Sequence, residues 1–150
     1  MQGKRLMALR IKIKQLDPDL PLPVFAHEDD AGCDLFSRTE IVLGPGERKL
    51  VPTGITFAIP EGYAGFILPR SGLALNYGIG VVNSPGLIDS GYRGEVAAVL
   101  INHDPQKEFR IKKGDKICQL VIQKIEKIQW DVVENLSKTK RGKRGFGSTK

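Results

Sequence analysis

The sequence predicts an all-β domain, a sandwich or jelly-roll, with one short helix. Short apolar or alternating segments recur at a spacing of roughly 8–12 residues, which is typical of such folds. The 17 glycines and 9 prolines supply turns between these segments. At 150 residues the chain is expected to form one domain, residues 1–136, followed by an arm rich in Gly, Lys and Arg, residues 137–150.

Each expected element follows from its local pattern. Residues 7–16 alternate apolar and polar side chains, which predicts a half-buried strand. Residues 71–77 predict the helix, with Ser71 as N-cap. Residues 86–95 predict a β-hairpin that turns at Asp89, Ser90 and Gly91, because apolar runs flank a glycine able to take a positive φ. The other expected strands are residues 31–37, 41–43, 49–52, 54–60, 63–69, 78–83, 86–88, 93–102, 109–111 and 117–128.

Charge and composition exclude several classes of protein. The net charge of +6 equals the number of basic residues in the arm, which holds no acid, so the body is close to neutral. A neutral body argues against a nucleic-acid-binding face. No apolar run reaches the roughly 18–20 residues of a membrane span, and the N-terminus has no signal-peptide pattern. Cys33 and Cys118 have no neighbours at the spacing of metal ligands. We expect both cysteines to be reduced and to pack in the core of a cytoplasmic protein.

Several segments carry candidate chemistry. Asp34 lies between apolar neighbours in a strand and needs a polar partner. Arg70 precedes the N-terminus of the expected helix, where free N–H groups and a fixed cation suit an anion. Gln119 is an amide inside an apolar strand. Each also has a structural interpretation, as a hydrogen-bond acceptor, a helix cap or a satisfied core amide.

Two further segments complete the set. Asp89 and Tyr92 place a carboxylate and an aromatic ring three residues apart, and Asn83 before them offers both a donor and an acceptor. The arm combines Arg141 with Phe146 among glycines, which suits phosphates and a flat ring. The structural alternatives are a surface turn and a disordered basic end.

In this order, residues 31–35, 69–74, 86–94, 114–120 and 141–149 resemble the five motifs of the trimeric dUTPase family, over essentially the whole chain. The resemblance implies a jelly-roll-like (β-clip) protomer in a homotrimer, with active sites shared between subunits. It also implies hydrolysis of dUTP to dUMP and pyrophosphate with Mg²⁺, which limits uracil in DNA and supplies dUMP for thymidylate synthesis.

The resemblance implies a role for each motif residue. Asp89 would orient and deprotonate the water that attacks the α-phosphorus, and Tyr92 would lie under the deoxyribose and exclude a 2′-hydroxyl. Mg²⁺ would be held by the triphosphate and waters, with Asp34 in the surrounding network and no direct protein ligand. The remaining implied substrate-binding residues are Asn83, Leu87, Ile88 and Ala97 for uracil, Arg70, Ser71, Gly72 and Gln119 for phosphates, and Arg141, Phe146, Gly147 and Ser148 in the closing arm.

Two features depart from the family pattern. Cys33 stands where the family has an aromatic or aliphatic residue. In the fifth motif, Lys143, Arg144 and Lys150 stand where the family has glycine or a neutral or acidic residue, and Arg144 replaces a glycine. Other functions on this sequence are a dCTP deaminase or bifunctional deaminase–dUTPase of the same fold, a non-catalytic nucleotide-sensing binder, and a basic nucleic-acid-binding β protein. The Asp89–Tyr92 segment and the Gly/Phe arm favour the dUTPase.

Overall fold

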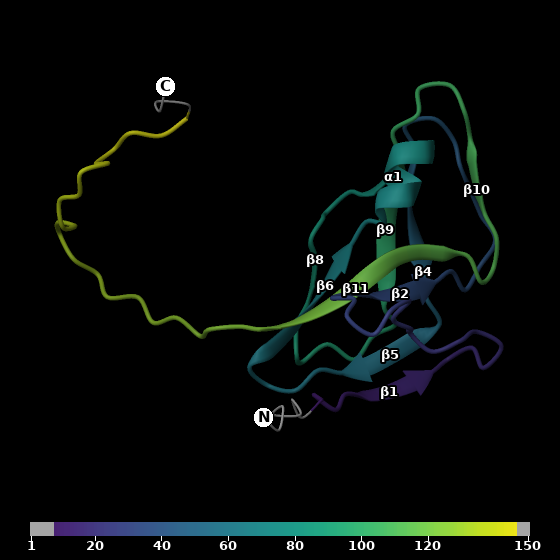
Figure 1. Ribbon diagram of the computed structural model, residues 1–150, viewed down its shortest axis with the longest axis horizontal. Coiled ribbons are helices and arrows are strands. Elements are labelled where there is room, and N and C mark those ends of the chain that lie inside the picture. Colours follow the sequence, from purple (N-terminus) through teal and green to yellow (C-terminus); the bar gives the residue numbers. More distant parts are fainter. Residues whose placement is uncertain (1–7, 147–150) are drawn as a thin grey trace.

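The computed structural model describes residues 8–146. Within these residues the chain forms eleven strands and one helix (Figure 1). In chain order they are β1 (Lys12–Gln15), β2 (Cys33–Phe36), β3 (Ile41–Leu43), β4 (Arg48–Pro52), β5 (Ile55–Ala58), β6 (Tyr63–Leu68), α1 (Ser71–Tyr77), β7 (Ile79–Val81), β8 (Gly86–Ile88), β9 (Ala97–Asn102), β10 (Phe109–Ile111) and β11 (Lys116–Lys124).

The strands form antiparallel sheets of jelly-roll type. The largest sheet has the order β2-β11-β6-β8, and a second has the order β4-β9-β7. Two smaller sheets pair β1 with β5 and β10 with β3. The predicted all-β class with one short helix is therefore confirmed.

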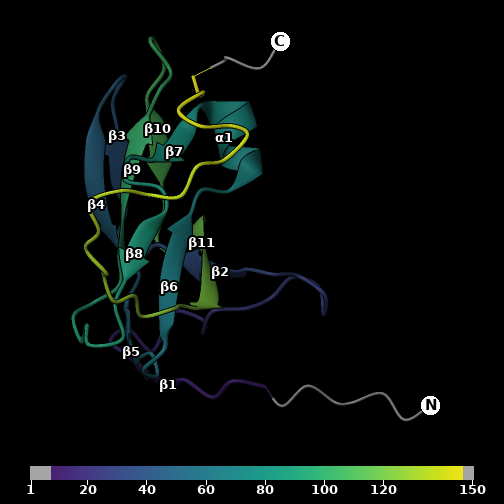
Figure 2. The same ribbon diagram turned by 90° about the vertical axis from the view of Figure 1, so that its left-hand side faces the viewer.

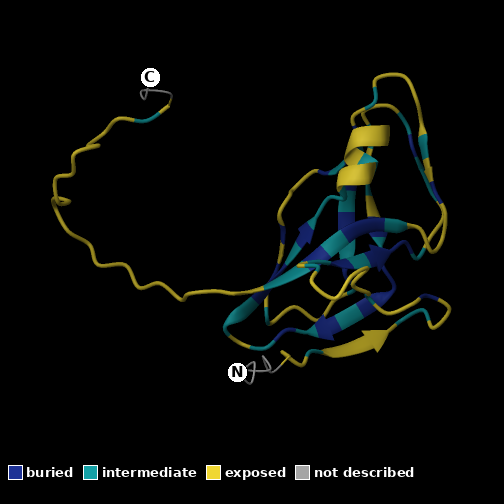
Figure 3. Cartoon of the chain, viewed as in Figure 1, coloured by how far each residue is buried: buried dark blue, intermediate teal, exposed yellow. Residues whose placement is uncertain are grey.

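The core lies among these sheets (Figure 3). Alternate residues of β9 point inward, as the period of a strand requires, so that Ala98, Leu100 and Asn102 are buried. Asn102 is the polar member, and its Nδ2 donates to the carbonyl oxygens of Leu43 and Lys107. These bonds satisfy a buried amide that would otherwise destabilise the fold.

The predicted hairpin over residues 86–95 is wrong. Strand β8 pairs with β6, whereas β9 pairs with β4 and β7. The segment between them, which we call the Asp89 loop (residues 89–95), therefore crosses from one sheet to the other. A local apolar pattern predicts strands but does not show which distant strand will supply the hydrogen bonds.

Three other local predictions need correction. Strand β1 is shorter than residues 7–16 and is exposed at all four positions, so it is not half-buried. The N-cap of α1 is Arg70, and Ser71 is the first helical residue. Strand β11 ends at Lys124 rather than at residue 128.

Beyond β11 the chain leaves the body as an extended segment (Figures 1 and 2). Its residues from Ile125 to Lys140 are exposed. The exposed segment thus starts before the predicted arm. The boundary between a domain over residues 1–136 and an arm over residues 137–150 stays a prediction. No helix within residues 8–146 is long and apolar enough to cross a membrane.

Candidate functional site

Three of the motif segments meet at one cavity of about 300 Å³. Strand β11 lies between β2 and β6 in the sheet, so Asp34 of β2, Gln119 of β11 and Arg70 after β6 are neighbours. The full lining is Ala26, Asp30, Ala31, Gly32, Asp34, Arg70, Ser71, Gly72 and Gln119. We call this the cationic cavity after Arg70, the one cation in a lining that also holds the carboxylates of Asp30 and Asp34.

Asp34 organises the charges of the cationic cavity. Its Oδ1 accepts a hydrogen bond from Nε of Arg70 at 3.0 Å, and its Oδ2 lies 2.8 Å from Nζ of Lys116. Nη1 of Arg70 also donates to the main-chain oxygen of Lys116 at 3.2 Å. The partner that Asp34 was expected to need is therefore a pair of cations, and its side chain is only 14% exposed.

Gln119 and the start of α1 supply the polar groups of the same cavity. Nε2 of Gln119 donates to the main-chain oxygen of Pro69 at 2.9 Å. A Cβ on Gly32 would lie 2.8 Å from Oε1 of Gln119, so the glycine makes room for the amide. Ser71 and Gly72 are exposed, and α1 has no side-chain capping bond. Their N–H groups can therefore meet an anion.

The Asp89 loop forms a second cavity of about 240 Å³. Its lining is Leu50, Leu87, Ile88, Asp89, Tyr92, Glu95, Val96 and Ala97. The N–H of Tyr92 donates to the main-chain oxygen of Asp89 at 3.1 Å. The hydroxyl of Tyr92 donates to the main-chain oxygen of Glu95 at 3.0 Å. The loop therefore holds a carboxylate and a ring beside an apolar floor. Asn83 is exposed before β8 and is not among the lining residues.

The two cavities have no lining residue in common. Ile88 pairs with Gly65 near the beginning of β6, whereas Arg70 follows the end of that strand. At about 3.3 Å per residue, this places Asp89 and Arg70 roughly 15–20 Å apart along β6. Within a single chain, therefore, Asp89 and Arg70 do not lie in the same cavity, although the sequence motifs assigned both residues to one site.

The arm residues lie outside both cavities. Nε of Arg141 donates to the main-chain oxygen of Arg144 at 2.9 Å, and Phe146 is fully exposed. The predicted residues Gly147 and Ser148 lie outside the described part of the chain.

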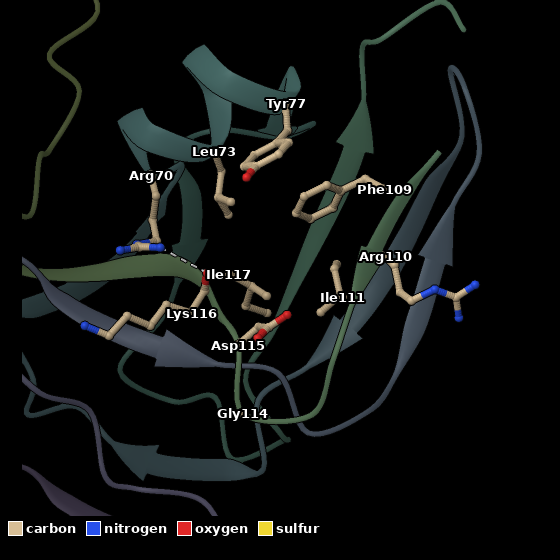
Figure 4. Close-up of a pocket in the computed structure, with 10 residues that line it drawn as sticks. All are labelled: Arg70, Leu73, Tyr77, Phe109, Arg110, Ile111, Gly114, Asp115, Lys116 and Ile117. Atoms are coloured by element: carbon tan, nitrogen blue, oxygen red, sulfur yellow. Dashed lines mark hydrogen bonds between the residues drawn. The ribbon is translucent and has the colours of Figure 1, made fainter. Parts of the chain in front are cut away.

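A larger cavity of about 630 Å³ also has Arg70 in its lining (Figure 4). Tyr77 of α1 and Phe109 of β10 lie side by side in its lining, with ring centroids 5.1 Å apart and ring planes tilted by 46°. Sequence reasoning missed this cavity, although the motif segments 69–74 and 114–120 supply part of its lining, because Tyr77, Phe109, Arg110 and Ile111 belong to no motif. It also missed Lys116, although that cation stands inside the motif at residues 114–120.

The two cysteines are free and buried, as expected for packing residues. Burial raises the pKa of Cys118 to about 12 and also raises the pKa of Cys33. Thiols in this state are poor nucleophiles, so neither one belongs to the reactive groups of the site.

The fold and the two cavities define a jelly-roll protein with one polar cavity that contains Arg70 and the start of α1, and a second cavity with an apolar floor beside Asp89. Comparison with known proteins gives the family. The family model for dUTPase matches residues 19–150. The chain belongs to the dUTPase family.

Curated relatives are similar over most of their length. The deoxyuridine 5′-triphosphate nucleotidohydrolase of Thermobifida fusca is 53% identical over 141 residues, which cover 94% of this chain and 79% of the relative. That of Corynebacterium glutamicum is 52% identical over 139 residues, which cover 93% of each chain.

Solved structures agree. The Staphylococcus bacteriophage 80alpha dUTPase with dUpNHpp has a TM-score of 0.87 at 30% identity, over 95% of this chain and 99% of that one. A variant of the dUTPase from phage phi11 of S. aureus, with a structural Mg(II) ion, has a TM-score of 0.79 at 27% identity, over 85% of this chain and 98% of that one.

Proposed function

We propose that this protein hydrolyses dUTP to dUMP and pyrophosphate. The observation that carries the proposal is the family match over residues 19–150, together with two cavities that hold residues of four of the five motifs. The curated relatives are named deoxyuridine 5′-triphosphate nucleotidohydrolases, and the phage relative binds a dUTP analogue.

The cationic cavity is the phosphate end of the proposed site. Arg70 offers a planar guanidinium whose orientation Asp34 holds through Nε. The N–H groups of Ser71 and Gly72 and the amide of Gln119 add uncharged donors. Fixed donors of this kind stabilise the charge that develops on the phosphoryl oxygens without reorganising during the reaction.

The cavity of the Asp89 loop is the nucleoside end. Leu87, Ile88 and Ala97 provide an apolar floor for uracil, and main-chain groups there can read its edge. The ring of Tyr92 lies under the deoxyribose. The carboxylate of Asp89 is exposed, so it can accept a hydrogen bond from a water, orient it toward the α-phosphorus and take its proton.

The separation of the cavities supports a site shared between chains. A catalytic base must lie within hydrogen-bond reach of its water, and that water must touch the phosphorus. Asp89 and Arg70 of one chain are too far apart along β6 for both to serve one triphosphate in this way. A second copy of the chain must therefore supply one of them.

The arm supports the homotrimer that the family resemblance implies. Arg141 and Phe146 line neither cavity of their own chain, so they would close over the substrate on another subunit. The exposed segment also carries large apolar side chains that need a cover, namely Ile128, Trp130, Val132, Val133 and Leu136.

The residues of the cationic cavity fit Mg²⁺ bound together with a triphosphate. Mg²⁺ keeps several waters and takes one or two carboxylates plus phosphate oxygens. Asp30 and Asp34 line the cavity, and within residues 8–146 no cluster of three His, Cys, Asp or Glu side chains forms a cage. We place the ion on the triphosphate, with Asp34 in its surrounding network. When bound, Mg²⁺ neutralises charge on the phosphate oxygens.

We also propose a cytoplasmic location, since both cysteines are free thiols, as a reducing compartment keeps them. There the enzyme would limit uracil in DNA and supply dUMP for thymidylate synthesis.

The test is release of pyrophosphate and of ammonia from dUTP, dTTP, dCTP and UTP with Mg²⁺, by wild type and Asp89→Asn. We expect turnover of dUTP alone, without ammonia, and a loss of about 10²- to 10⁴-fold in kcat for the variant. Glu40→Gln, which alters an exposed carboxylate paired with Arg110, is the control and should be fully active. Folded wild type that leaves dUTP intact would refute the proposal, and ammonia release from dCTP would indicate a deaminase.

A further inference from the structure

The ring of Tyr92 has two supports in its own loop. Its hydroxyl donates to the main-chain oxygen of Glu95 at 3.0 Å. The ring also covers Gly94 so closely that a Cβ there would lie 2.3 Å from the hydroxyl oxygen and 2.5 Å from Cζ. The place of the ring therefore depends on a bare glycine and on the position of the main chain at residue 95.

The side chain of Glu95 anchors that main chain to the body. Its Oε1 accepts a hydrogen bond from the N–H of Gly54 at 2.8 Å. Its Oε2 accepts from Nη1 of Arg38 at 3.1 Å, and the Glu95 side chain is only 27% exposed. Gly54 has a φ of +73°, a conformation that side chains rarely adopt, so its N–H is aimed by a specialised turn.

The two groups that bind the Glu95 carboxylate, Arg38 and the N–H of Gly54, are in turn linked through Leu16. Nη2 of Arg38 donates to the main-chain oxygen of Leu16 at 3.4 Å, and the N–H of Leu16 donates to the oxygen of Gly54 at 2.7 Å. Arg38, Gly54 and Leu16 thus form a closed set of bonds around the carboxylate of Glu95. Such a set gives the loop a fixed base although the loop crosses between two sheets.

We propose that Glu95 is a positioning residue which, with Gly94, fixes the Tyr92 ring and thereby determines the preference for deoxyribose over ribose. The proposal rests on the proposed function, in which that ring lies under the sugar. Without the Glu95 carboxylate, Gly54 N–H and Arg38 lose their acceptor and the main chain at residue 95 is released. The ring then no longer occupies the space that a 2′-hydroxyl would need.

The test is the ratio of kcat/KM for dUTP to that for UTP. We expect Glu95→Ala to lower this ratio about tenfold or more, because discrimination depends on the ring's position. Glu95→Gln keeps an oxygen that can accept from Gly54 N–H and should recover most of the ratio. The matched control, Glu40→Ala, removes an exposed carboxylate paired with an arginine 3.2 Å away and should leave the ratio unchanged.

Gly94→Ala provides an independent variant. The backbone at Gly94 is outside the positive-φ region, so alanine fits the chain, and only the far end of the Tyr92 side chain must move. We expect the same fall in the ratio with an unchanged melting temperature. This variant decides the matter if Glu95→Ala fails to fold. An unchanged ratio in folded Gly94→Ala and Glu95→Ala overturns the positioning role, whereas a wild type inactive on dUTP overturns the proposed function itself.

Discussion

Nε of Arg70 lies 3.0 Å from Oδ1 of Asp34, and this bond joins the beginning of α1 to β2 across the strand between them. The same carboxylate holds Lys116 through its other oxygen at 2.8 Å. One partly buried acid therefore sets the direction of two cations beside the phosphate cavity. The acid acts by placing positive charge, in addition to any part it has in the metal's surroundings.

Asp34→Asn should reduce kcat/KM for dUTP by about tenfold or more, because a neutral amide holds two cations less firmly than a carboxylate. The measurement is steady-state kinetics at saturating Mg²⁺, with Glu40→Gln as the control at an exposed arginine pair. A variant within twofold of wild type would contradict the role assigned to Asp34.

Mixed oligomers test the shared site. Asp89→Asn and Arg70→Ala should each be inactive alone, but unfolding and refolding them together should restore activity. In a random mixture about a quarter of sites would combine an intact Asp89 from one chain with an intact Arg70 from another. The idea fails if native mass spectrometry detects mixed trimers and the mixture is no more active than its components.

Phe146→Ala should lower kcat/KM for dUTP about tenfold, because a ring that covers uracil excludes water from the site. The melting temperature should not change, since the side chain is fully exposed in the free chain. Leu75→Ala, which shortens another exposed apolar side chain on α1, is the matched control and should be fully active. Equal kinetics for the two variants would remove Phe146 from the site.

The buried thiols should resist modification. Burial raises the pKa of Cys118 to about 12, so only roughly one thiol in ten thousand is ionised at pH 8. Native protein should react slowly with a disulfide reagent at pH 8, and unfolded protein should react rapidly at both cysteines. Leu75→Cys, at an exposed site, reports the rate for an accessible thiol. Rapid labelling of the native wild type would show that the core opens.

Stability should depend on pH through Asp17. A hydrogen bond from Lys113, 2.8 Å away, lowers the pKa of Asp17 below its ordinary value of 3.8. A lowered pKa in the folded state stabilises the protein above the unfolded pKa, and this stabilisation is lost as the pH falls through the folded value. Wild type should therefore melt above Asp17→Asn at pH 7, and the gap should close as the pH falls below about 4. A constant gap between pH 7 and pH 3 would contradict this origin.

Local patterns in the sequence were sufficient for the fold class and most elements. Short apolar runs between turn residues predicted most strands, β9 among them within residues 93–102, and Ser71 as a possible N-cap predicted α1 over residues 71–77. The motif segments identified Asp34, Arg70, Gln119, Asp89 and Tyr92 as candidates, because polar groups among apolar neighbours need a partner or a ligand.

The tertiary structure alone decided which of these groups meet. Strand pairing depends on hydrogen bonds between residues far apart in the sequence, so the local pattern could not show that β8 joins β6 while β9 joins another sheet. For the same reason, only the fold shows that Lys116 forms an ion pair with Asp34 and that Glu95 accepts a hydrogen bond from the N–H of Gly54. It also sets Asp89 and Arg70 at opposite ends of β6, because a strand is rigid and separates what lies beyond its two ends.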